Sequence, residues 1–316
     1  MIKSEPDRKR SKDLGIDLKT IKLFEKIAKA VAPPPIMTVS QWADAERRLS
    51  AESSAEAGRW NTDRAPYQRE ILDAVNNPEC EEVVIMSSAQ VGKTELILNT
   101  IGYYIDYDPA PILVVNPTIE MAQTFSKDRL APMIRDTPAL RGKVRDAKSK
   151  NSGNTILHKQ FPGGHITMAG ANSPASLASR PIRIALMDEI DRYPASAGTE
   201  GNPIKLAEKR TTTFWNRKKI KVSTPTIKGQ SQIEAEFLTG SQEEWCVPCP
   251  CCGKYQPYEW GRIHFSDVTM ECKFCGEHIS EVDWKQQKGK YIAKFPDRKR
   301  KRSFHLNELA SPWKHW

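Results

Sequence analysis

The fold is decided by the stretch Val83-Val84-Ile85-Met86-Ser87-Ser88-Ala89-Gln90-Val91-Gly92-Lys93-Thr94. Its first four residues are apolar and predict a buried strand, and its closing Gly-Lys-Thr is typical of a phosphate-binding loop that opens a helix. In such a loop the backbone N–H groups and the helix N-terminus bind phosphate oxygens. The sequence therefore predicts a nucleoside triphosphate site formed by eight residues: Ser87, Ser88, Ala89, Gln90, Val91, Gly92, Lys93 and Thr94.

Two side chains of this loop have expected roles. Lys93 would neutralise the β- and γ-phosphates, and the Thr94 hydroxyl would bind Mg²⁺. One position departs from the usual pattern, because Ser87 stands where the first glycine is expected. A side chain there requires a loop without positive φ at that residue. Since Gly-Lys-Thr alone occurs by chance in many chains, the assignment depends on its surroundings.

A second apolar run, Ile182 to Met187, ends in the acidic pair Asp188-Glu189. A nucleotide bound to a parallel sheet lies outside the carboxyl ends of the strands. We therefore expect Asp188 to face the Mg²⁺ and Glu189 to polarise the attacking water. An isolated Asp-Glu would more simply be a solvated turn after a strand, but the phosphate loop upstream favours the catalytic interpretation.

A third strand, Ile220-Lys221-Val222, ends in Ser223-Thr224-Pro225-Thr226. Hydroxyl groups at a strand end beside the nucleotide could sense the γ-phosphate and pass its loss to a neighbouring element. We therefore expect residues 223–225 to couple hydrolysis to movement.

Aromatic residues and a glutamine precede the phosphate loop in the segment 58–69. The Gln68 amide could read the adenine edge through both its donor and its acceptor, and Tyr67 or Trp60 could pack on the base. The alternative is that both aromatic side chains are core residues, and for Trp60 this alternative is preferred. The predicted nucleotide is therefore ATP, with Tyr67 and Gln68 at the base.

Six of the seven cysteines lie between Cys246 and Cys275, a concentration that indicates metal rather than disulfides. Two C-x-x-C-G knuckles stand 19 residues apart, a spacing that can close a tetrahedral thiolate site around Zn²⁺. The expected ligands of a structural zinc are Cys249, Cys252, Cys272 and Cys275. Cys246 and Cys251 are left over, and Cys246-x-x-Cys249 stays open as a competing pair.

The chain of 316 residues carries a net charge of +9, and much of the excess lies in three basic runs, 8–12, 217–219 and 298–302. Such runs beside a nucleotide motif favour a nucleic acid partner bound through its phosphates. No apolar run approaches the length of a membrane span and no signal peptide is visible. We therefore expect a soluble, intracellular protein without a membrane partner.

Strand and helix candidates alternate along residues 83–223, which predicts a covered, mainly parallel sheet. The expected strands are 83–87, 112–116, 154–158, 165–169, 182–187 and 219–223, and the expected helices are 93–106, 118–135 and 203–214. We divide the chain into a basic N-terminal segment with a proline linker (1–36), which could dock a partner, an ATPase domain (37–244), a zinc-ribbon-like module (245–280) and a basic segment (281–316).

Taken together, the motifs resemble the large terminase subunit of lambda-type tailed phages. The segments that carry the resemblance are Trp42-Ala43-Asp44-Ala45, Gly58-Arg59-Trp60, Pro66-Tyr67-Gln68-Arg69, the phosphate loop, Met187-Asp188-Glu189, Ser223-Thr224-Pro225-Thr226 and the paired knuckles. The resemblance implies an α/β P-loop NTPase fold of the ASCE type. It also implies an ATP-driven motor that packages double-stranded DNA into a procapsid in the host cytoplasm. Its partners would be a small terminase subunit, the portal and further copies in a ring.

By position, the resemblance makes Lys93 and Thr94 the phosphate-loop residues, Asp188 the Mg²⁺ ligand, Glu189 the base and Ser223-Thr224-Pro225 the coupling motif. One departure concerns the loop, because many terminases carry an arginine where Gln90 and Val91 stand here. The transition-state arginine must then come from elsewhere. Arg180 is the first candidate and Arg210 the second, although both could be structural ion-pair residues.

A second departure concerns the nuclease of this family, which would follow the segment matched by Ser303 to Trp313. We therefore expect these 316 residues to hydrolyse ATP without cutting DNA. Two other hypotheses remain: a DNA helicase or remodelling ATPase, and a non-enzymatic zinc-ribbon DNA-binding protein with a degenerate phosphate loop.

Overall fold

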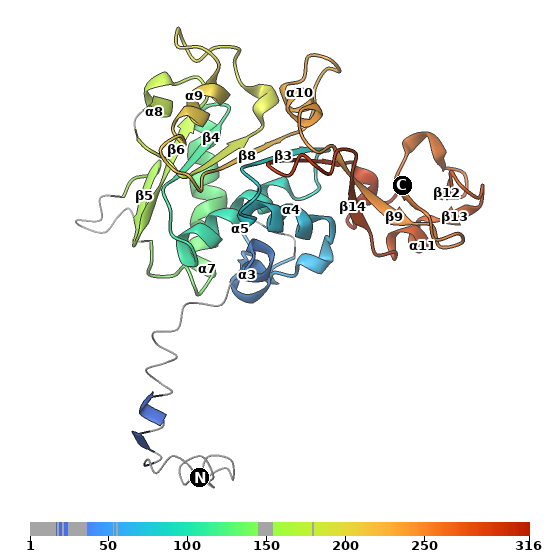
Figure 1. Ribbon diagram of the computed structural model, residues 1–316, viewed down its shortest axis with the longest axis horizontal. Helices are drawn as coiled ribbons and strands as arrows, with labels where there is room; N and C mark the ends of the chain where they lie inside the picture. Colours follow the sequence, from blue (N-terminus) through green and yellow to red (C-terminus); the bar gives the residue numbers. More distant parts are fainter. Residues whose placement is uncertain are drawn as a thin grey trace. The chain divides into compact units, whose positions relative to one another are not determined.

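The computed structural model describes residues 17, 19–20, 22–24, 37–52, 54, 56–144, 154–178 and 180–316. It divides into two compact units, Met1–Met37 and Thr38–Trp316. Most of the first unit lies outside the described residues, including the basic run 8–12 and most of the segment expected to dock a partner. The second unit carries the sheet, the nucleotide motifs and the cysteines (Figure 1).

Ten strands of the described residues form one sheet in the order β10-β9-β15-β3-β8-β7-β4-β6-β5, with β14 paired to β9. The strands are β3 (Glu82–Ser87), β4 (Ile112–Asn116), β5 (His158–Phe161), β6 (Gly164–Gly170), β7 (Ile184–Asp188), β8 (Lys218–Ser223), β9 (Glu243–Pro248), β10 (Tyr255–Pro257), β14 (Lys290–Ala293) and β15 (Lys301–Leu306). All pairings from β9 to β6 are parallel, and β5, β10 and β14 pair antiparallel at the two ends. The expected mainly parallel sheet is confirmed.

Helices cover both faces of this sheet, as Figure 1 shows for α3, α4 and α5 on one side and α8, α9 and α10 on the other. The helices are α3 (Val39–Glu46), α4 (Tyr67–Asn76), α5 (Lys93–Asp106), α6 (Ile119–Phe125), α7 (Ala131–Asp136), α8 (Pro174–Ala178), α9 (Pro203–Lys209), α10 (Gln232–Leu238) and α11 (Glu281–Lys285), with a π-helical turn η2 (Ser126–Leu130). On the α8–α10 side, Val84, Val115 and Met187 of the strands pack with Ile204 and Ile233 of the helices. This core fixes the strand ends that carry the motifs.

Shorter elements complete the chain. They are β1 (Arg48–Leu49), β2 (Gly58–Arg59), β11 (Ile263–His264), β12 (Thr269–Glu271), β13 (His278–Ser280) and the 3₁₀ turns η1 (Thr62–Arg64), η3 (Ile190–Arg192), η4 (Trp260–Arg262) and η5 (Glu308–Ala310). The strands β11, β12 and β13 form a small antiparallel sheet beside the cysteines. Within the described residues, no helix is long and apolar enough to cross a membrane.

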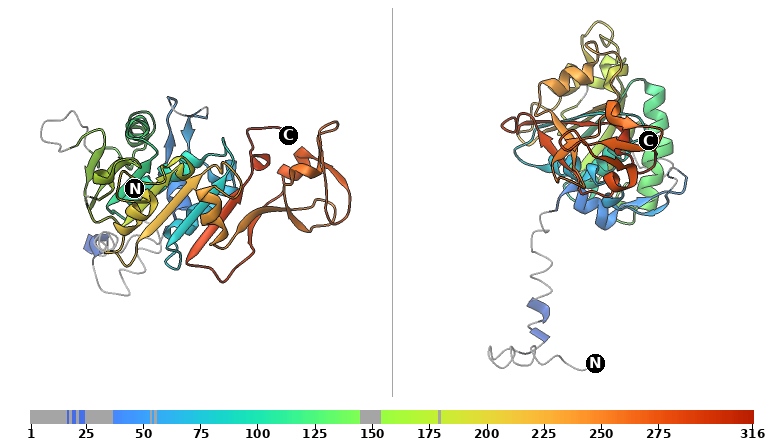
Figure 2. Two further views of the ribbon diagram at one scale, coloured as in Figure 1. Left: turned by 90° about the horizontal axis from the view of Figure 1, so that it is seen from above. Right: turned by 90° about the vertical axis from the view of Figure 1, so that its right-hand side faces the viewer.

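The sheet continues past residue 244, where we placed the end of the ATPase domain. The strand β15 lies between β3 and β9 and is parallel to both, so the basic segment contributes a central strand beside the phosphate-loop strand. Figure 2 shows the C-terminal strands side by side with the earlier ones. The zinc-ribbon-like part, 249–281, therefore lies between β9 and β14 of the same sheet and itself contributes the edge strand β10.

Two of the three basic runs lie inside this architecture. Arg217 pairs with Glu81 at 2.7 Å, Arg302 pairs with Glu243 at 2.6 Å, and the Lys218 ammonium donates to backbone carbonyls. The remaining pairs join Lys219 to Glu81 and Glu82, Lys299 to Glu79, Arg300 to Glu81, and Lys301 to Glu82 and Glu236. Several of these cations share one carboxylate, since Glu81 pairs with Arg217, Lys219 and Arg300, so contact of the two runs with a polyanion stays a prediction.

A buried lysine lies at the centre of this network. Lys221 of β8 is fully buried, and its ammonium lies 2.6 Å from Glu208 of α9 and 2.8 Å from Glu236 of α10. Burial alone would lower the pKa of Lys221, but the nearby carboxylates, Glu82 included, raise it to about 12. The charged lysine therefore ties both helices to the strand that ends in the coupling motif.

Candidate nucleotide site and cysteine cluster

The phosphate loop joins β3 to α5 through two residues with left-handed backbone. Gln90 has φ +61° and Gly92, at the N-cap of α5, has φ +85°. Ser87 is the last residue of β3 and is absent from the positive-φ residues of the described chain. A serine is therefore tolerated at the usual glycine position, as expected from the sequence, because the chain is still extended there.

The side chain of Gln68 supports this loop. It is buried in α4, and its Nε2 donates to the Val91 carbonyl at 3.2 Å. A Cβ at Gly92 would come within 2.3 Å of the same nitrogen, so only glycine fits beside Gln68. The Gln68 Oε1 is buried without a hydrogen-bond partner in the structure. One N–H of the amide is thus bound to the loop, while a second N–H and the Oε1 acceptor have no hydrogen-bond partner among the described residues, so reading of adenine by Gln68 stays a prediction.

The expectation that the Tyr67 ring packs on the nucleotide base does not fit the position of this side chain. Its side chain is buried, and its ring packs edge-on against Trp245 of β9 with centroids 6.2 Å apart. Burial raises the pKa of the Tyr67 hydroxyl well above its usual value. Tyr67 therefore offers no open face to a base. Trp60 is a core residue, as preferred from the sequence, and its Nε1 donates to Thr62 at 2.8 Å.

The three predicted motifs meet at the carboxyl ends of β3, β8 and β7. The Lys93 ammonium lies 3.3 Å from Glu189 Oε1 and donates to the Thr224 hydroxyl. Glu189 has φ +54° and ψ +49°, which is unusual for a residue with a side chain. Such strained residues concentrate at functional sites. The left-handed turn accompanies the ion pair with Lys93, so the base candidate and the phosphate-loop lysine are in direct contact.

Asp188 and Thr94 provide the oxygen atoms that Mg²⁺ prefers. Asp188 ends β7, and Thr94 lies in the first turn of α5. Burial and the adjacent Glu189 raise the pKa of Asp188 to about 7. A bound cation would favour the ionised carboxylate, so this chemistry fits a magnesium site.

Asp191 is a residue of the site that the sequence did not single out. Its Oδ2 accepts from the Thr226 backbone at 2.9 Å and from the Thr226 hydroxyl at 3.0 Å, and its Oδ1 accepts from the Ile233 backbone at 2.7 Å. Its own N–H donates to Ser223 Oγ at 3.2 Å. Asp191 thus joins the turn after Glu189 to the coupling motif and to α10. In the sequence, Asp191 could not be distinguished from an ordinary solvent-exposed aspartate in a turn.

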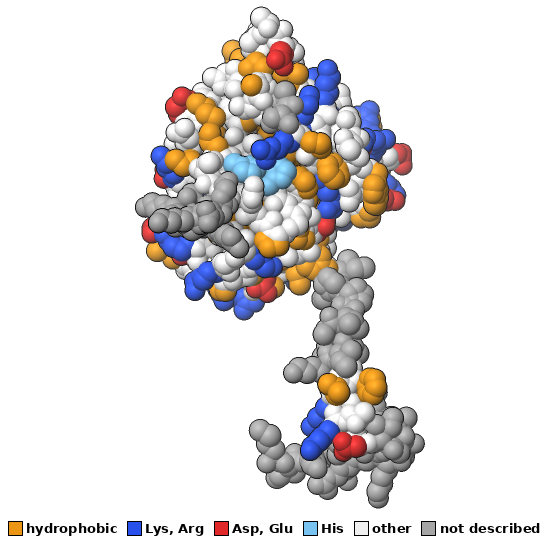
Figure 3. All heavy atoms as spheres, turned by 90° about the vertical axis from the view of Figure 1, so that its left-hand side faces the viewer, with side chains coloured by type: hydrophobic (Ala, Val, Ile, Leu, Met, Phe, Trp, Pro, Cys, Tyr) orange, Lys and Arg blue, Asp and Glu red, His pale blue; other side chains and the backbone are white. Residues whose placement is uncertain are grey.

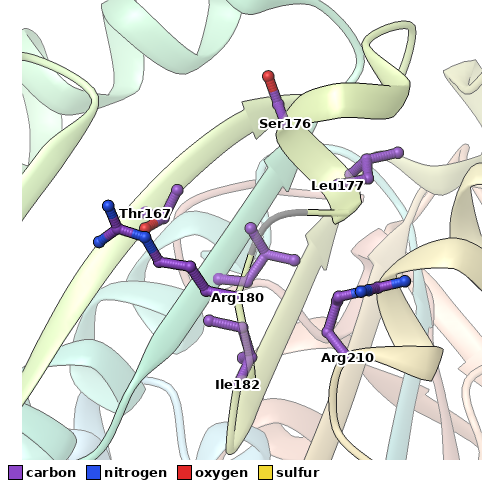
Figure 4. Close-up of a pocket in the computed structure, with 7 residues that line it drawn as sticks. Thr167, Ser176, Leu177, Arg180, Ile182 and Arg210 are labelled. Atoms are coloured by element: carbon purple, nitrogen blue, oxygen red, sulfur yellow. The ribbon is translucent and has the colours of Figure 1, made fainter.

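The two arginine candidates lie away from Lys93. Arg210 is the C-cap of α9, and its carbonyl accepts from the Ile182 backbone at 3.0 Å, ahead of the start of β7. Glu189 follows the other end of that strand, which is five residues long and therefore spans about 17 Å. Figure 4 shows the guanidinium groups of Arg180 and Arg210 pointing apart at a small pocket. Neither is part of the Lys93 site in its own chain.

Arg180 instead belongs to an exposed cluster near β5 and β6. Its Nη1 lies 3.3 Å from His158 Nε2, and the His158 and His165 rings are 5.4 Å apart. Figure 3 shows this side of the molecule, with histidine side chains gathered at the surface beside Lys or Arg. Arg192 is the arginine that pairs with Glu189, at 3.8 Å, and it is mostly exposed.

The four cysteines chosen from the sequence come together. Their sulfur atoms all lie within 4.8 Å of one another, and the pairs Cys249–Cys275 and Cys252–Cys272 are each 3.8 Å apart. A tetrahedral site with Zn–S bonds of about 2.3 Å has sulfur–sulfur edges of about 3.8 Å, so the arrangement fits zinc. Cys246 is buried in β9, and Cys251 is exposed outside the cluster.

Backbone N–H groups point at two of these sulfurs. The N–H of Cys252 lies 3.5 Å from the Cys249 sulfur, and the N–H of Phe274 lies 3.4 Å from the Cys272 sulfur. Such hydrogen bonds stabilise thiolate ligands. The knuckles and the β11–β13 sheet then form one small unit.

This fold and site define a P-loop nucleoside triphosphatase with a cysteine-rich insertion. The strand β8 lies between the phosphate-loop strand β3 and the acidic strand β7, and Lys93 contacts Glu189 just after β7 and Thr224 just after β8. Residues 54–291 match the model of the family described as phage terminase large subunit gpA, ATPase domain. The chain belongs to this family.

Two curated relatives are similar to most of the chain. The terminase large subunit of Enterobacteria phage P21 is 31% identical over 277 residues, covering 83% of this chain and 42% of the relative. The terminase large subunit of Escherichia phage lambda is 31% identical over 230 residues, covering 72% of this chain and 36% of the relative. The chain therefore spans less than half the length of these relatives.

Among solved structures, two of the large terminase ATPase domain of Thermus phage P74-26 are loosely similar. Both have a TM-score of 0.42. One, of a mutant of that domain, is 17% identical, and the match covers 62% of this chain and 80% of that chain. The other is 13% identical, and the match covers 82% of this chain and 86% of that chain.

Proposed function

We propose that this chain is the ATPase part of a motor that drives double-stranded DNA into a phage procapsid. The observation that carries the proposal is the contact of Lys93 with both Glu189 and Thr224 in a chain of the terminase family. In that contact the residue that binds the γ-phosphate touches the candidate base and the candidate coupling motif. Hydrolysis and movement can therefore share one switch.

The chemistry follows from the charges. Lys93 is held by Glu189 in the structure, and a γ-phosphate would compete for the same ammonium. Glu189, freed from Lys93, is then placed to accept a proton from the attacking water. A magnesium ion on Thr94 and Asp188 would neutralise the charge that develops on the phosphates. The backbone of residues 87–94 would bind the phosphate oxygens, and the free Gln68 acceptor could reach the base.

Coupling would run through the contacts of Asp191. Loss of the γ-phosphate changes the partners of Lys93, of which Thr224 is one, and Asp191 ties that segment to α10 through Thr226 and Ile233. The helix α10 is linked in turn to β15, since the Phe237 carbonyl accepts from Ser303 Oγ at 2.9 Å. Residues 223–225 would thus pass the state of the nucleotide to α10 and, through β15, to β9, which leads into the cysteine-rich part.

Arg180 would act in the site of a neighbouring copy in a ring. It is exposed, and it lies far from Glu189 of its own chain. We expect Arg180→Ala and Glu189→Gln each to lose ATP turnover when assembled alone, because each lacks one half of every site. Mixing the two variants should restore a measurable part of the activity, since some interfaces then pair an intact Arg180 with an intact Glu189. Mixtures no more active than the separate variants would contradict the role.

The partners that accompany this function are double-stranded DNA, a small terminase subunit, the portal of the procapsid and further copies of the chain. The host cytoplasm is where such packaging takes place. The zinc held by the four cysteines would be structural.

The proposal is tested with the full-length protein, its small subunit, procapsids and linear DNA. ATP should make the DNA resistant to nuclease, and Lys93→Ala should abolish this protection because the γ-phosphate loses its cation. The matched control is Lys209→Ala, an exposed lysine of α9. Protection that survives Lys93→Ala, or ATP-dependent strand separation in place of protection, would contradict the proposal.

A further inference from the structure

Unpaired lysines gather near the β9 end of the sheet. Lys254, Lys290 and Lys294 are exposed, and within the described chain no carboxylate forms an ion pair with any of them. The runs 217–219 and 298–302, by contrast, are largely paired internally. These three lysines are therefore available to an anionic partner.

Lys294 lines a groove on one face of β9, β10 and β14, and Lys290 lies over the ring of Tyr255, which also lines it. Strand alternation and register place Cys246, Pro257 and Ile292 on this face. The groove has a volume of about 470 Å³, and Lys273, beside the zinc ligand Cys272, lines it from the cysteine-rich part. We call it the Tyr255 groove, because Tyr255 of β10 supplies its exposed ring.

Aromatic rings and lysine ammonium groups lie together at Tyr255 in this groove and at Phe274 in the adjoining knuckle 272–275. The Tyr255 ring is 36% exposed, and Lys290 Nζ lies 4.3 Å from its centroid. Phe274 is 47% exposed, and the ammonium groups of Lys254 and Lys273 each lie 5.2 Å from its centroid. Lys273 also pairs with Glu259 at 3.9 Å, whereas Lys254 and Lys290 form no ion pair among the described residues. Exposed rings beside cations are the combination by which proteins bind single-stranded nucleic acid, with bases on the rings and phosphates on the cations.

We propose that the Tyr255 groove binds a single strand of DNA, with a base on Tyr255 and phosphates on Lys273, Lys290 and Lys294. The volume suits a group of nucleotide size, and a base stacked inside a duplex offers no face to a ring. Glu244, which also lines the groove, can accept a hydrogen bond from an exocyclic amino group of a base. The proposal rests on the proposed function in that DNA is the substrate.

The experiment measures binding of a short labelled oligonucleotide to the chain without ATP, across a salt series. Tyr255→Ala should weaken binding of the single strand about tenfold, whereas Tyr255→Phe, which keeps the ring, should bind like the unmodified chain. The double variant Lys290→Ala/Lys294→Ala should lower the slope of log affinity against log salt by about 1.4. The control double variant Lys209→Ala/Lys299→Ala removes the same charge elsewhere and should leave the affinity unchanged.

Three results would overturn the proposal. The first is equal binding of the single strand by Tyr255→Ala and Tyr255→Phe, and the second is a Tyr255→Ala variant that loses as much affinity for the matching duplex as for the single strand. The third is displacement of the oligonucleotide by polyglutamate whose own binding requires Lys290 and Lys294. Thermal unfolding of each variant checks that the fold is kept. Packaging that proceeds without binding of the single strand would contradict only the proposed role of the groove. Binding of the single strand by a protein that cannot package DNA would instead contradict the proposed function.

Discussion

Glu189→Gln should lower ATP turnover by roughly 10²-fold or more, the loss typical of a missing general base. Glutamine keeps the shape of the side chain but cannot accept the proton of the attacking water. ATP affinity should stay close to that of the unmodified protein, because Lys93 loses its ion pair with Glu189 and remains free for the γ-phosphate. Single-turnover hydrolysis and binding of a fluorescent ATP analogue, measured on one preparation, separate the two effects.

The matched control is Glu200→Gln, an exposed glutamate eleven positions further along the chain. It should leave both turnover and affinity unchanged. If Glu189→Gln hydrolyses ATP as fast as this control, Glu189 has no part in the proton transfer.

Cys272→Ser should abolish zinc binding and unfold the part of the chain between β9 and α11. Structural zinc contributes about 10–16 kcal/mol of apparent binding energy in small zinc-finger peptides, and a unit of this size has little core of its own. We expect metal analysis to find one zinc per unmodified chain and almost none in the variant. Protease should then cut within 249–281, while strands far from this insertion, such as β4 and β7, stay protected from hydrogen exchange.

Cys251→Ser is the control, because Cys251 is exposed and lies outside the sulfur cluster. It should keep its zinc and its resistance to protease. A metal-free unmodified chain whose insertion already resists protease would show that the four cysteines are held together without an ion.

The parallel core could be predicted from the sequence because its signals are local. The apolar run 112–116 and the helix 93–106 were predicted at the bounds that β4 and α5 have in the structure. The cysteine set also followed from local spacing. The helix expected at 118–135 is divided by the π-helical turn η2, and the helix expected at 203–214 ends at Lys209.

The parts that were missed depend on contacts between distant residues. The strand β15 was hidden by its charge, since Lys301 and Arg302 belong in a sheet only because Glu236 and Glu243 neutralise them. The sequence placed Tyr67 near the nucleotide loop but could not show which way its side chain points. In the structure the ring packs against Trp245 and lies in the core. The role of Asp191 depends on Thr226 and Ile233, which follow only after another strand.

The central claim is that ATP is bound and hydrolysed where β3, β7 and β8 end, and the most direct measurement is a structure with Mg²⁺ and ADP–beryllium fluoride. We expect the γ-phosphate mimic on Lys93, the cation between Thr94 and Asp188, and Glu189 separated from Lys93 with a water molecule beside it. A nucleotide bound elsewhere, or a Lys93–Glu189 ion pair that persists beside the bound mimic, would contradict the account.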